Sequence, residues 1–309
     1  MESEVTFIII AFNEVTNVTQ CIESIFNQES DSNFLITLVD DGSTDGTADL
    51  VEREFPERVK VIRQRNSGRG LARLTGILST NSTYIAMVDS DICLPKNWLS
   101  RCLSEISNYQ GVGGIAVPDG DSSTISRLFD LKTRATPGSI NLTGNNSLFK
   151  TEVLKEIGTQ WVTRLGEDFR LQRLLEQHGH KTSRIENLFV EHMEHKSFID
   201  TFSWFFDSGK DATKLWFTFK ITRMPDIAFF GFLSLLLAAP VLFLTFGPKA
   251  MAIVPIFLLL IGLAQLCLKF KVEEKPFNAL VAWIPNSILM CSYLLGRTYG
   301  LFLLSTSWG

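Results

Sequence analysis

The sequence of 309 residues contains only five cysteines, and none of them belongs to a Cys-x-x-Cys pair. Without such paired spacing, the sequence suggests neither a zinc site nor a disulfide framework. Two of the cysteines lie within long apolar stretches, so we expect all five to be reduced residues that contribute to packing. The five cysteines are Cys21, Cys93, Cys102, Cys267 and Cys291.

The sequence also lacks an excess of positive charge, because 29 Lys and Arg residues are set against 33 Asp and Glu residues. The resulting net charge of -4 gives no reason to expect a nucleic-acid partner. Residues 1–4 are polar and acidic and only a short apolar run follows them, so we expect no secretory leader. We therefore expect the N-terminal part of the chain to lie in the cytosol.

Apolar residues are concentrated in the C-terminal third of the chain. Three stretches there contain no charged residue, and each is long enough to cross a hydrocarbon core about 30 Å thick as a helix. They run from Ile227 to Pro248, from Ala250 to Leu268 and from Pro276 to Gly296. The sequence therefore predicts that residues 226–309 form a membrane domain with about three transmembrane helices.

The basic residues around these stretches predict an orientation. Positively charged residues are enriched in cytosolic loops. Most of the Lys and Arg residues that flank the three stretches would lie on the same side of the membrane as the N-terminal part of the chain. These are Lys210, Lys214, Lys220 and Arg223 before the first stretch and Lys269, Lys271 and Lys275 in the second loop, against Lys249 and Arg297 on the other side. We expect a multi-pass membrane protein with a cytosolic N-terminal domain.

Residues 198–225 form a separate amphipathic region. From Phe198 to Phe219 the apolar residues recur at helical spacing, whereas Lys210 and Lys214 lie on another face. This pattern is typical of a helix in the membrane interface. It fits a helix that faces the core of a water-exposed domain equally well, and the sequence leaves both interpretations open.

The first 115 residues alternate between short β-branched runs and helical patterns. The runs are Val5 to Ala11, Leu35 to Asp40, Val59 to Arg63 and Tyr84 to Val88, with helices expected over residues 17–27, 47–55 and 70–79. This alternation predicts βαβ units on a mostly parallel sheet. Ligands of such sheets bind beyond the carboxyl ends of the strands, where this chain places Asn13, Glu14, Asp40, Asp41, Asn66, Asp89 and Asp91.

The segment Asp89-Ser90-Asp91 directly follows the fourth run. Two carboxylates two residues apart at a strand end can both bind one hard divalent cation, such as Mg²⁺ or Mn²⁺, and leave positions for phosphate oxygens. The same short motif also occurs in ordinary turns whose aspartates cap a helix. A metal site at Asp89 and Asp91 is therefore one of two interpretations.

The run from Asp40 to Thr47 joins a buried strand to a helix through a turn that contains glycine. A carboxylate placed there can accept hydrogen bonds from a pyrimidine N–H or from ribose hydroxyls. Asp41 is the better candidate for that contact, because Asp45 is expected to cap the following helix.

Together these segments resemble the family 2, or GT-A-like, glycosyltransferases, over the region from Val5 to about His195. The shared parts are Phe12-Asn13-Glu14, Asp40 to Thr47, Asn66 to Arg73, Asp89 to Asp91, Gly144-Asn145-Asn146 with Lys150, and Gly166-Glu167-Asp168. The resemblance implies that residues 1–197 form a cytosolic α/β domain with a Rossmann-like fold that binds a nucleotide-diphosphate sugar. It further implies that the first two motifs bind the base and the ribose and that Asp89 and Asp91 hold Mg²⁺ or Mn²⁺ on the diphosphate.

The resemblance assigns the catalytic base to Asp168. The segment Gly166-Glu167-Asp168 opens a helical pattern that Gly179 ends, and the positive end of a helix dipole keeps a carboxylate ionised. Such a carboxylate can remove the proton of an acceptor hydroxyl while the anomeric carbon is attacked from the face opposite the diphosphate, which inverts its configuration. Without the other motifs, Glu167 and Asp168 are equally well interpreted as ordinary first-turn acids.

Further candidates follow from the same resemblance. The donor-binding set is Asn13, Glu14, Asp41, Asn66, Arg69 and Asp89, and the acceptor-side set is Asn145, Asn146 and Glu167. Arg69 has the alternative of being an ordinary exposed loop residue. His192 or His195 is a candidate third metal ligand, with satisfied surface histidines as the other interpretation. The polar segment from Gly120 to Gly138 is expected to be a surface or lid loop.

One motif of related enzymes is missing, because no Gln-x-x-Arg-Trp follows Asp168. Processive polysaccharide synthases carry that motif, so we favour an inverting, metal-dependent hexosyltransferase that adds one sugar to a lipid-linked acceptor, a polyprenyl phosphate or glycolipid, beside membrane lipids. Two alternatives stay open, a synthase that elongates a polysaccharide and a non-catalytic membrane protein that binds nucleotide sugars.

Overall fold

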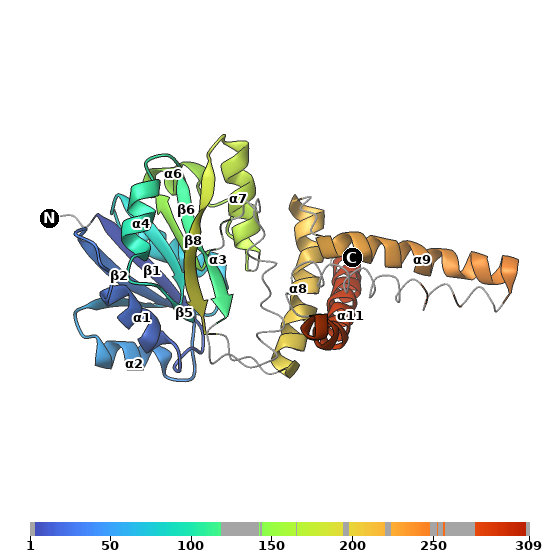
Figure 1. Cartoon of the computed structure of the whole chain (residues 1–309). Coiled ribbons are helices and arrows are strands. Elements are labelled where there is room, and N and C mark those ends of the chain that lie inside the picture. The colour runs from blue at the N-terminus through green and yellow to red at the C-terminus, as the bar shows by residue number, and fades with distance from the viewer. Residues whose placement is uncertain are drawn as a thin grey trace. The chain divides into compact units, whose positions relative to one another are not determined.

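A computed structural model gives the structure of the chain (Figure 1). It describes residues 4–118, 142, 144–164, 166–193, 198–219, 224–247, 252, 256 and 276–306. The chain divides into two compact units, Met1–His195 and Lys196–Gly309. The expected lid loop from Gly120 to Gly138, His195 and nearly all of the second apolar stretch lie outside the described residues.

The first unit contains an eight-stranded sheet with the strand order β3-β2-β1-β4-β7-β6-β8-β5. Its strands are β1 Val5–Ala11, β2 Phe34–Asp40, β3 Val59–Arg63, β4 Tyr84–Asp89, β5 Ile92–Cys93, β6 Gly111–Pro118, β7 Asn146–Lys150 and β8 Thr182–His192. Its helices are α1 Val18–Phe26, α2 Thr47–Glu54, α3 Arg69–Leu78, α4 Trp98–Glu105, α6 Thr151–Ile157 and α7 Glu167–Gln177.

The half of the sheet formed by β1 to β4 is parallel, as the sequence predicts. β1 pairs in parallel with β2 and β4, and β2 pairs in parallel with β3. The predicted strands and helices of this half are confirmed to within about one residue at each end. The other half is mixed, since β7 is antiparallel to β4 and β6, whereas β6 and β8 are parallel.

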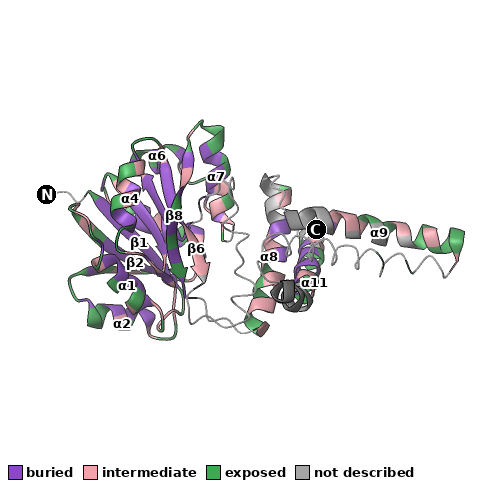
Figure 2. Ribbon diagram, viewed as in Figure 1, coloured by how far each residue is buried: buried purple, intermediate pink, exposed green. Residues whose placement is uncertain are grey.

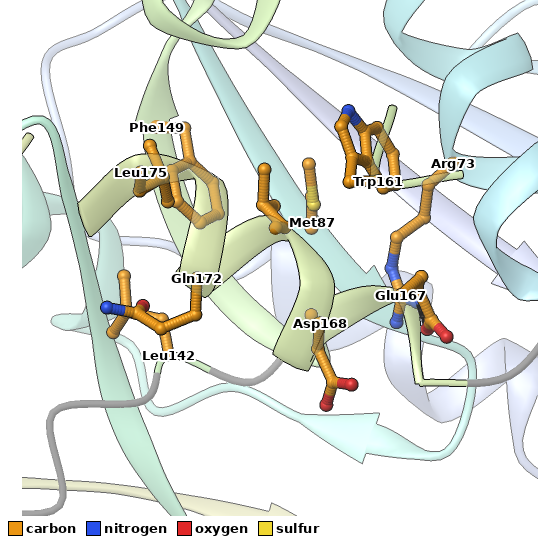
Figure 3. Close-up of a pocket in the computed structure, with 11 residues that line it drawn as sticks. Arg73, Met87, Leu142, Phe149, Trp161, Glu167, Asp168, Gln172 and Leu175 are labelled. Atoms are coloured by element: carbon orange, nitrogen blue, oxygen red, sulfur yellow. Dashed lines mark hydrogen bonds and ion pairs between the residues drawn. The ribbon is translucent and has the colours of Figure 1, made fainter. Parts of the chain in front are cut away.

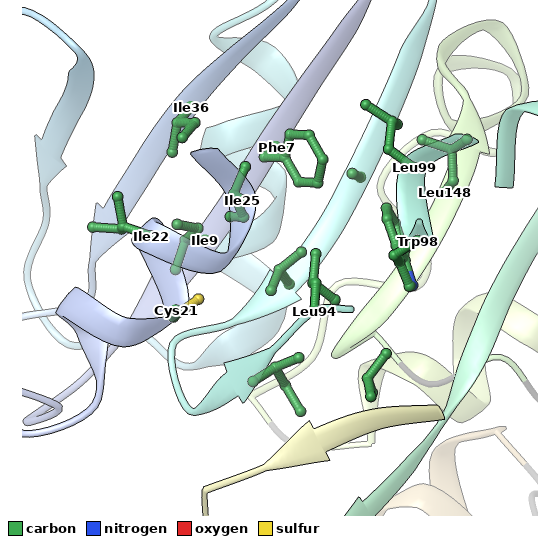
Figure 4. Close-up of a cluster of buried hydrophobic side chains, with 14 of the residues drawn as sticks. Phe7, Ile9, Cys21, Ile22, Ile25, Ile36, Leu94, Trp98, Leu99 and Leu148 are labelled. Carbon is green, nitrogen blue, oxygen red and sulfur yellow. The ribbon is translucent and has the colours of Figure 1, made fainter. Parts of the chain in front are cut away.

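Helices cover both faces of the sheet, and the side chains of β1 alternate between them. Phe7 and Ile9 pack with residues of α1, α2 and α4 on one face (Figure 4). Ile8 and Ile10 pack with residues of α3, α6 and α7 on the other face. Burial on both faces explains why β1 is an almost continuous apolar run, and Figure 2 shows the strands as largely buried and the helices as exposed on their outer sides.

The second unit contains the helices α8 Phe198–Phe219, α9 Met224–Phe246 and α11 Pro276–Thr306. Gly209 of α8 and Gly296 of α11 each face the backbone of the other helix, where a Cβ atom would clash. The Ser292 hydroxyl of α11 also donates a hydrogen bond of 2.7 Å to the carbonyl oxygen of Phe202 in α8. Small and hydroxyl-bearing residues therefore allow these two helices to pack closely.

Two of the three predicted apolar stretches coincide with helices of this unit. α9 covers nearly all of the first, and α11 starts with the third and continues for nearly three turns past its predicted end. Among the residues that the structure describes, no helix has the combination of length and hydropathy that a membrane crossing requires.

Candidate active site

Two aspartates lie at the carboxyl end of β4, as predicted. Asp89 ends the strand, and its Oδ1 accepts a hydrogen bond of 2.7 Å from Nη2 of Arg73. Asp91 lies just before β5, and its Oδ2 is 3.1 Å from Nε2 of His192. The side chains of both aspartates are 19% exposed, so the two carboxylates are partly accessible from solvent.

His192 is buried rather than at the surface, with an exposure of 7%. The interpretation of a satisfied surface histidine is therefore wrong for this residue. The physical reason is the pairing of β5 with β8, which places Ile92 opposite His192 and so brings the imidazole to Asp91. The imidazole thus contacts Asp91, whereas Asp89 pairs with Arg73, and the ligand atoms of these three residues do not all lie within 4.8 Å of one another.

Arg73 of α3 connects this edge to the start of α7. Its side chain is 3% exposed, and its guanidinium forms ion pairs with both Asp89 and the buried Glu167. Gly144 leaves room for this guanidinium, because a Cβ atom at that position would lie 2.5 Å from Cζ of Arg73. The sequence motif from Asn66 to Arg73 does not single out Arg73, although its spacing of four residues from Arg69 places both arginines on one helix face.

Glu167 is the centre of an ion-pair cluster and is only 2% exposed. Besides pairing with Arg73, its Oε1 lies 3.5 Å from Nε of Arg69. The expectation that Glu167 faces an acceptor is therefore not supported. Its carboxylate is enclosed because it neutralises a buried arginine, and a buried charge requires such a partner.

Arg69 lies among four carboxylates, although its side chain is 43% exposed. Burial acts to lower the pKa of Arg69, but the negative charges of Glu167, Asp89, Asp168 and Asp91 together raise it. The alternative of an ordinary exposed loop residue is therefore half right, because Arg69 is partly exposed but is the first residue of α3 and pairs with Glu167.

Asp168 lies in the first turn of α7, as predicted. Gly166 precedes it with φ of 77°, a left-handed conformation that glycine adopts without strain. Burial and the negative charge of Glu167 raise the pKa of Asp168, and the attraction of Arg69 and Arg73 offsets only part of this effect. The positive end of the helix therefore does not dominate the pKa of Asp168. The raised pKa makes this carboxylate a stronger base than an ordinary aspartate.

A pocket lies beside this acid pair (Figure 3). Its lining is mainly apolar and includes Met87, Phe149 and Trp161. Figure 3 shows Glu167 next to Arg73, while the carboxylate of Asp168 points away from the apolar side chains. The acids of α7 thus form a polar edge on an otherwise apolar pocket.

The loop after β1 is fastened to the loop after β2. Asn13 adopts φ of 58°, and its Oδ1 accepts a hydrogen bond of 2.8 Å from the Thr44 N–H. The Glu14 N–H donates to Oγ1 of Thr47 at 2.9 Å. Asn13 therefore contributes to the shape of the two loops that were predicted to bind the donor.

Asp45 lies one residue before the N-cap of α2, which is Gly46 and makes no side-chain capping bond. Its Oδ1 nevertheless accepts a hydrogen bond of 3.0 Å from the first N–H of α2, at Thr47, and its Oδ2 accepts one of 3.1 Å from the Val15 N–H. Although burial acts to raise the pKa of Asp45, hydrogen bonds from the Thr47 hydroxyl and from these two N–H groups lower it.

Asp41 is buried, with an exposure of 5%, and it organises the loop after β3. Its carboxylate accepts hydrogen bonds from the Gln64 side chain at 2.7 Å and from the backbone N–H groups of Ser67 and Gly68 at 2.8 Å each. Asn66 in the same loop accepts a bond of 2.6 Å from Arg164. Protein groups thus bind the carboxylate that was expected to contact the nucleotide.

Asn145 and Asn146 are buried, with exposures of 8% and 1%. Nδ2 of Asn146 donates to Oδ1 of Asn145 at 2.9 Å, and Oδ1 of Asn146 accepts a bond of 2.6 Å from the Gly114 N–H. This contact lies at an irregularity between β6 and β8. The structure therefore gives Asn146 a role within the sheet and does not support its predicted contact with an acceptor.

Comparison with known proteins agrees with these features. The sequence profile described as Glycosyl transferase family 2 matches residues 6–164, just over half of the 309 residues. Glycosyltransferase AglE of Haloferax volcanii is 26% identical over 167 residues, which are 50% of this chain and 55% of AglE. The chondroitin synthase of Escherichia coli is 33% identical over 103 residues, 33% of this chain and 15% of that protein. The match thus covers about half of the length of AglE and a smaller part of the chondroitin synthase.

The fold is also similar to that of a solved enzyme. The mannosyltransferase PcManGT from Pyrobaculum calidifontis, solved in complex with GDP-Man and Mn²⁺, matches with a TM-score of 0.59 and 14% identity over 97% of this chain and 88% of PcManGT. This likeness supports the expected mixed α/β fold of the GT-A type. Because the family profile matches more than half of the sequence, the chain belongs to glycosyl transferase family 2.

Proposed function

We propose that this chain is an inverting glycosyltransferase that moves one sugar from a nucleotide-diphosphate sugar to a lipid-linked acceptor, either a polyprenyl phosphate or a glycolipid. The observation that carries the proposal is that Arg73 pairs with both Asp89 at the end of β4 and Glu167, which precedes Asp168 in the first turn of α7. The cluster lies where ligands of such sheets bind, beyond the carboxyl end of β4, in a domain of glycosyl transferase family 2.

The residues at the end of β4 suit a divalent cation. Asp89, Asp91 and His192 supply two carboxylates and one imidazole nitrogen, and the two carboxylates are partly exposed. Carboxylates suit Mn²⁺ and Mg²⁺, whereas an imidazole ligand favours Mn²⁺ of the two. A bound cation would offset the charge of the departing diphosphate, and the Mn²⁺ bound to PcManGT supports this assignment.

Asp168 is the proposed general base. Its raised pKa increases its affinity for a proton, and it lines the pocket with an intermediate exposure to solvent. It removes the proton of the acceptor as the acceptor oxygen attacks the anomeric carbon from the face opposite the diphosphate. Arg69 has the exposure to contact the diphosphate, whereas Arg73 is enclosed by its two carboxylates.

Attachment of the second unit to a membrane is part of the proposal. Large apolar side chains lie exposed on its helices, among them Leu237, Leu244 and Phe302 with exposures of 72%, 84% and 62%. Exposed apolar surface of this kind marks contact with a partner or a lipid phase. The Gly-x-x-x-Gly segment from Gly296 to Gly300 is also common where membrane helices pack closely. Alkaline extraction of cell membranes should leave the chain in the pellet, and its release into the supernatant would contradict this part.

The activity itself is tested by incubating the purified chain, reconstituted in lipid, with radiolabelled nucleotide sugars and polyprenyl phosphate. The expected product is a labelled lipid from which mild acid releases a single sugar, and Asp168→Asn is the matched control. Label in an insoluble polymer would indicate a polysaccharide synthase. Tight nucleotide binding without transfer from any donor would indicate a non-catalytic binding protein.

A further inference from the structure

Three potential metal ligands meet at the end of the first unit's α6 and α7. Glu156 lies in the last turn of α6, and His178 and His180 follow α7. Their ligand atoms all lie within 4.8 Å of one another. Oε1 of Glu156 is 3.4 Å from Nδ1 of His178, and Oε2 is 3.3 Å from Nε2 of His180.

The turn that ends α7 holds the two histidines in place. Gly179 adopts φ of 76°, its N–H donates to the Glu176 carbonyl at 3.0 Å, and the His180 N–H donates to the Leu175 carbonyl at 2.9 Å. These are the two hydrogen bonds of a Schellman motif, in which His178 and His180 flank the left-handed glycine. The two imidazole rings stack with centroids 6.2 Å apart and an interplanar angle of 10°.

The core of the domain fixes the distance between the glutamate and the histidines. Val153, Leu154 and Ile157 of α6 are buried in the same cluster as Leu174 and Leu175 of α7. Glu156 is adjacent to the buried Ile157, and His178 and His180 lie within a few residues of the buried Leu175. The arrangement is therefore set by packing and backbone hydrogen bonds before any ligand binds, which lowers the ordering cost of binding.

We propose that Glu156, His178 and His180 form a binding site for a Zn²⁺-type transition metal ion. Ligands of a tetrahedral zinc ion at bond lengths of about 2.0 to 2.1 Å lie roughly 3.3 Å apart. Each histidine lies at about this separation from one oxygen of Glu156, His178 from Oε1 and His180 from Oε2. Two imidazoles and one carboxylate are a donor set that zinc sites use, with water in the fourth position. Mg²⁺ prefers oxygen ligands only.

This site is separate from the one at Asp89 and Asp91. Asp168 and His178 lie at opposite ends of α7, ten residues or roughly 15 Å apart along the helix. An ion bound by Glu156, His178 and His180 would connect the end of α6 to the segment between α7 and β8. Its expected effect is to stabilise the first unit by binding the folded state only.

The test is a Zn²⁺ titration of the full-length chain after EDTA treatment and removal of the chelator, with excess Mg²⁺ present to compete at carboxylate sites. A chromophoric chelator reports Zn²⁺ affinity, and Co²⁺ in place of Zn²⁺ reports tetrahedral coordination through its visible absorption. We expect Zn²⁺ to bind the parent and to raise its Tm. Glu156→Gln and His178→Ala should each lower the affinity for Zn²⁺ by about tenfold or more, the scale expected for losing a metal-site residue.

Two controls make the result specific. Glu152→Gln changes an exposed acid one turn earlier on α6, and it should bind Zn²⁺ like the parent. Circular dichroism of the metal-free variants checks that they are folded, and Glu156→Gln preserves the size of the side chain if His178→Ala does not fold. An absence of Zn²⁺ binding at micromolar concentrations, or equal binding by the parent and Glu156→Gln, would overturn the proposal and leave an ordinary ion pair.

Discussion

The loops after β1, β2 and β3 differ from the edge formed by β4 and α7 in how their polar side chains are bound. In the loops, Asn13, Asp41 and Asp45 accept hydrogen bonds from backbone N–H groups of neighbouring loops. At the edge, carboxylates are instead bound by two arginines. Hydrogen bonds of the first kind fix backbone shape, whereas clustered charges with shifted pKa values are typical of sites that do chemistry. Substitutions in the loops should therefore act through stability, whereas substitutions at the edge should affect reactivity and, at the buried pair of Arg73 and Glu167, stability as well.

The largest effect is expected for Asp168→Asn at the edge. Transfer of sugar should fall by about 10² to 10⁴, the usual contribution of a positioned general base, because an amide cannot accept the proton. Nucleotide binding should remain close to that of the parent. Steady-state kinetics with titration calorimetry separates the two quantities, and a transfer rate near that of the parent would place the base elsewhere.

The same variant has a stability readout with a defined sign. A carboxyl group whose pKa is raised by folding destabilises the folded state at a pH above that pKa, and protonation relieves the effect. The neutral Asp168→Asn variant should therefore have a Tm equal to or above that of the parent at neutral pH. A clear decrease in Tm would instead indicate a structural role for Asp168.

The next effect is expected for Glu167→Gln. Loss of one partner from a buried ion pair destabilises a protein by about 3 to 5 kcal/mol, and Arg73 would keep only Asp89 as a charged partner. Urea unfolding measures the change. Glu176→Gln on the same helix is the control, because Glu176 is 43% exposed and its surface ion pair should contribute little. Equal stability of both variants would mean that the Arg73 cluster does not hold α7 in place.

A smaller effect is expected for Asp41→Asn in the loops. The amide replaces one acceptor oxygen with a donor, so one of the N–H groups of Ser67 and Gly68 loses its partner. Leaving such a buried group unsatisfied costs about 1 to 3 kcal/mol. Chemical unfolding checks the value against Asp31→Asn, a change at an exposed position. An unchanged free energy of unfolding together with lost nucleotide binding would restore Asp41 as a direct ligand.

The smallest effect concerns Asp45 and pH. Because folding lowers the pKa of Asp45 from its ordinary value of 3.8, the parent gains stability from this group at higher pH and loses it as the pH falls through the lowered pKa. The stability difference between the parent and Asp45→Asn should therefore be constant near neutral pH and disappear in acid. A difference that does not change with pH would show that the capping bonds do not depend on charge.

The sequence predicts the half of the sheet formed by β1 to β4 well, because each strand there is a local apolar run between clear turn signals. It also places Asp89 and Asp91 at the end of a strand and Asp168 at the start of a helix, because these motifs are local. It does not predict that Glu167 pairs with Arg73, since these residues are 94 positions apart, nor that Asn146 is buried, which depends on how β7 pairs with its neighbours. The burial of His192 follows likewise from a pairing between distant strands.

The central claim is that the edge at Asp89 and Asp91 binds a nucleotide diphosphate through a divalent cation. The most direct measurement is the affinity of the full chain for GDP and UDP by titration calorimetry, with Mn²⁺ and with EDTA, in the parent and in Asp91→Asn. We predict that Mn²⁺ increases the affinity of the parent for at least one nucleotide by about tenfold or more, a coupling within the usual range, and that Asp91→Asn loses this increase. Equal Mn²⁺ dependence in both proteins would contradict the account.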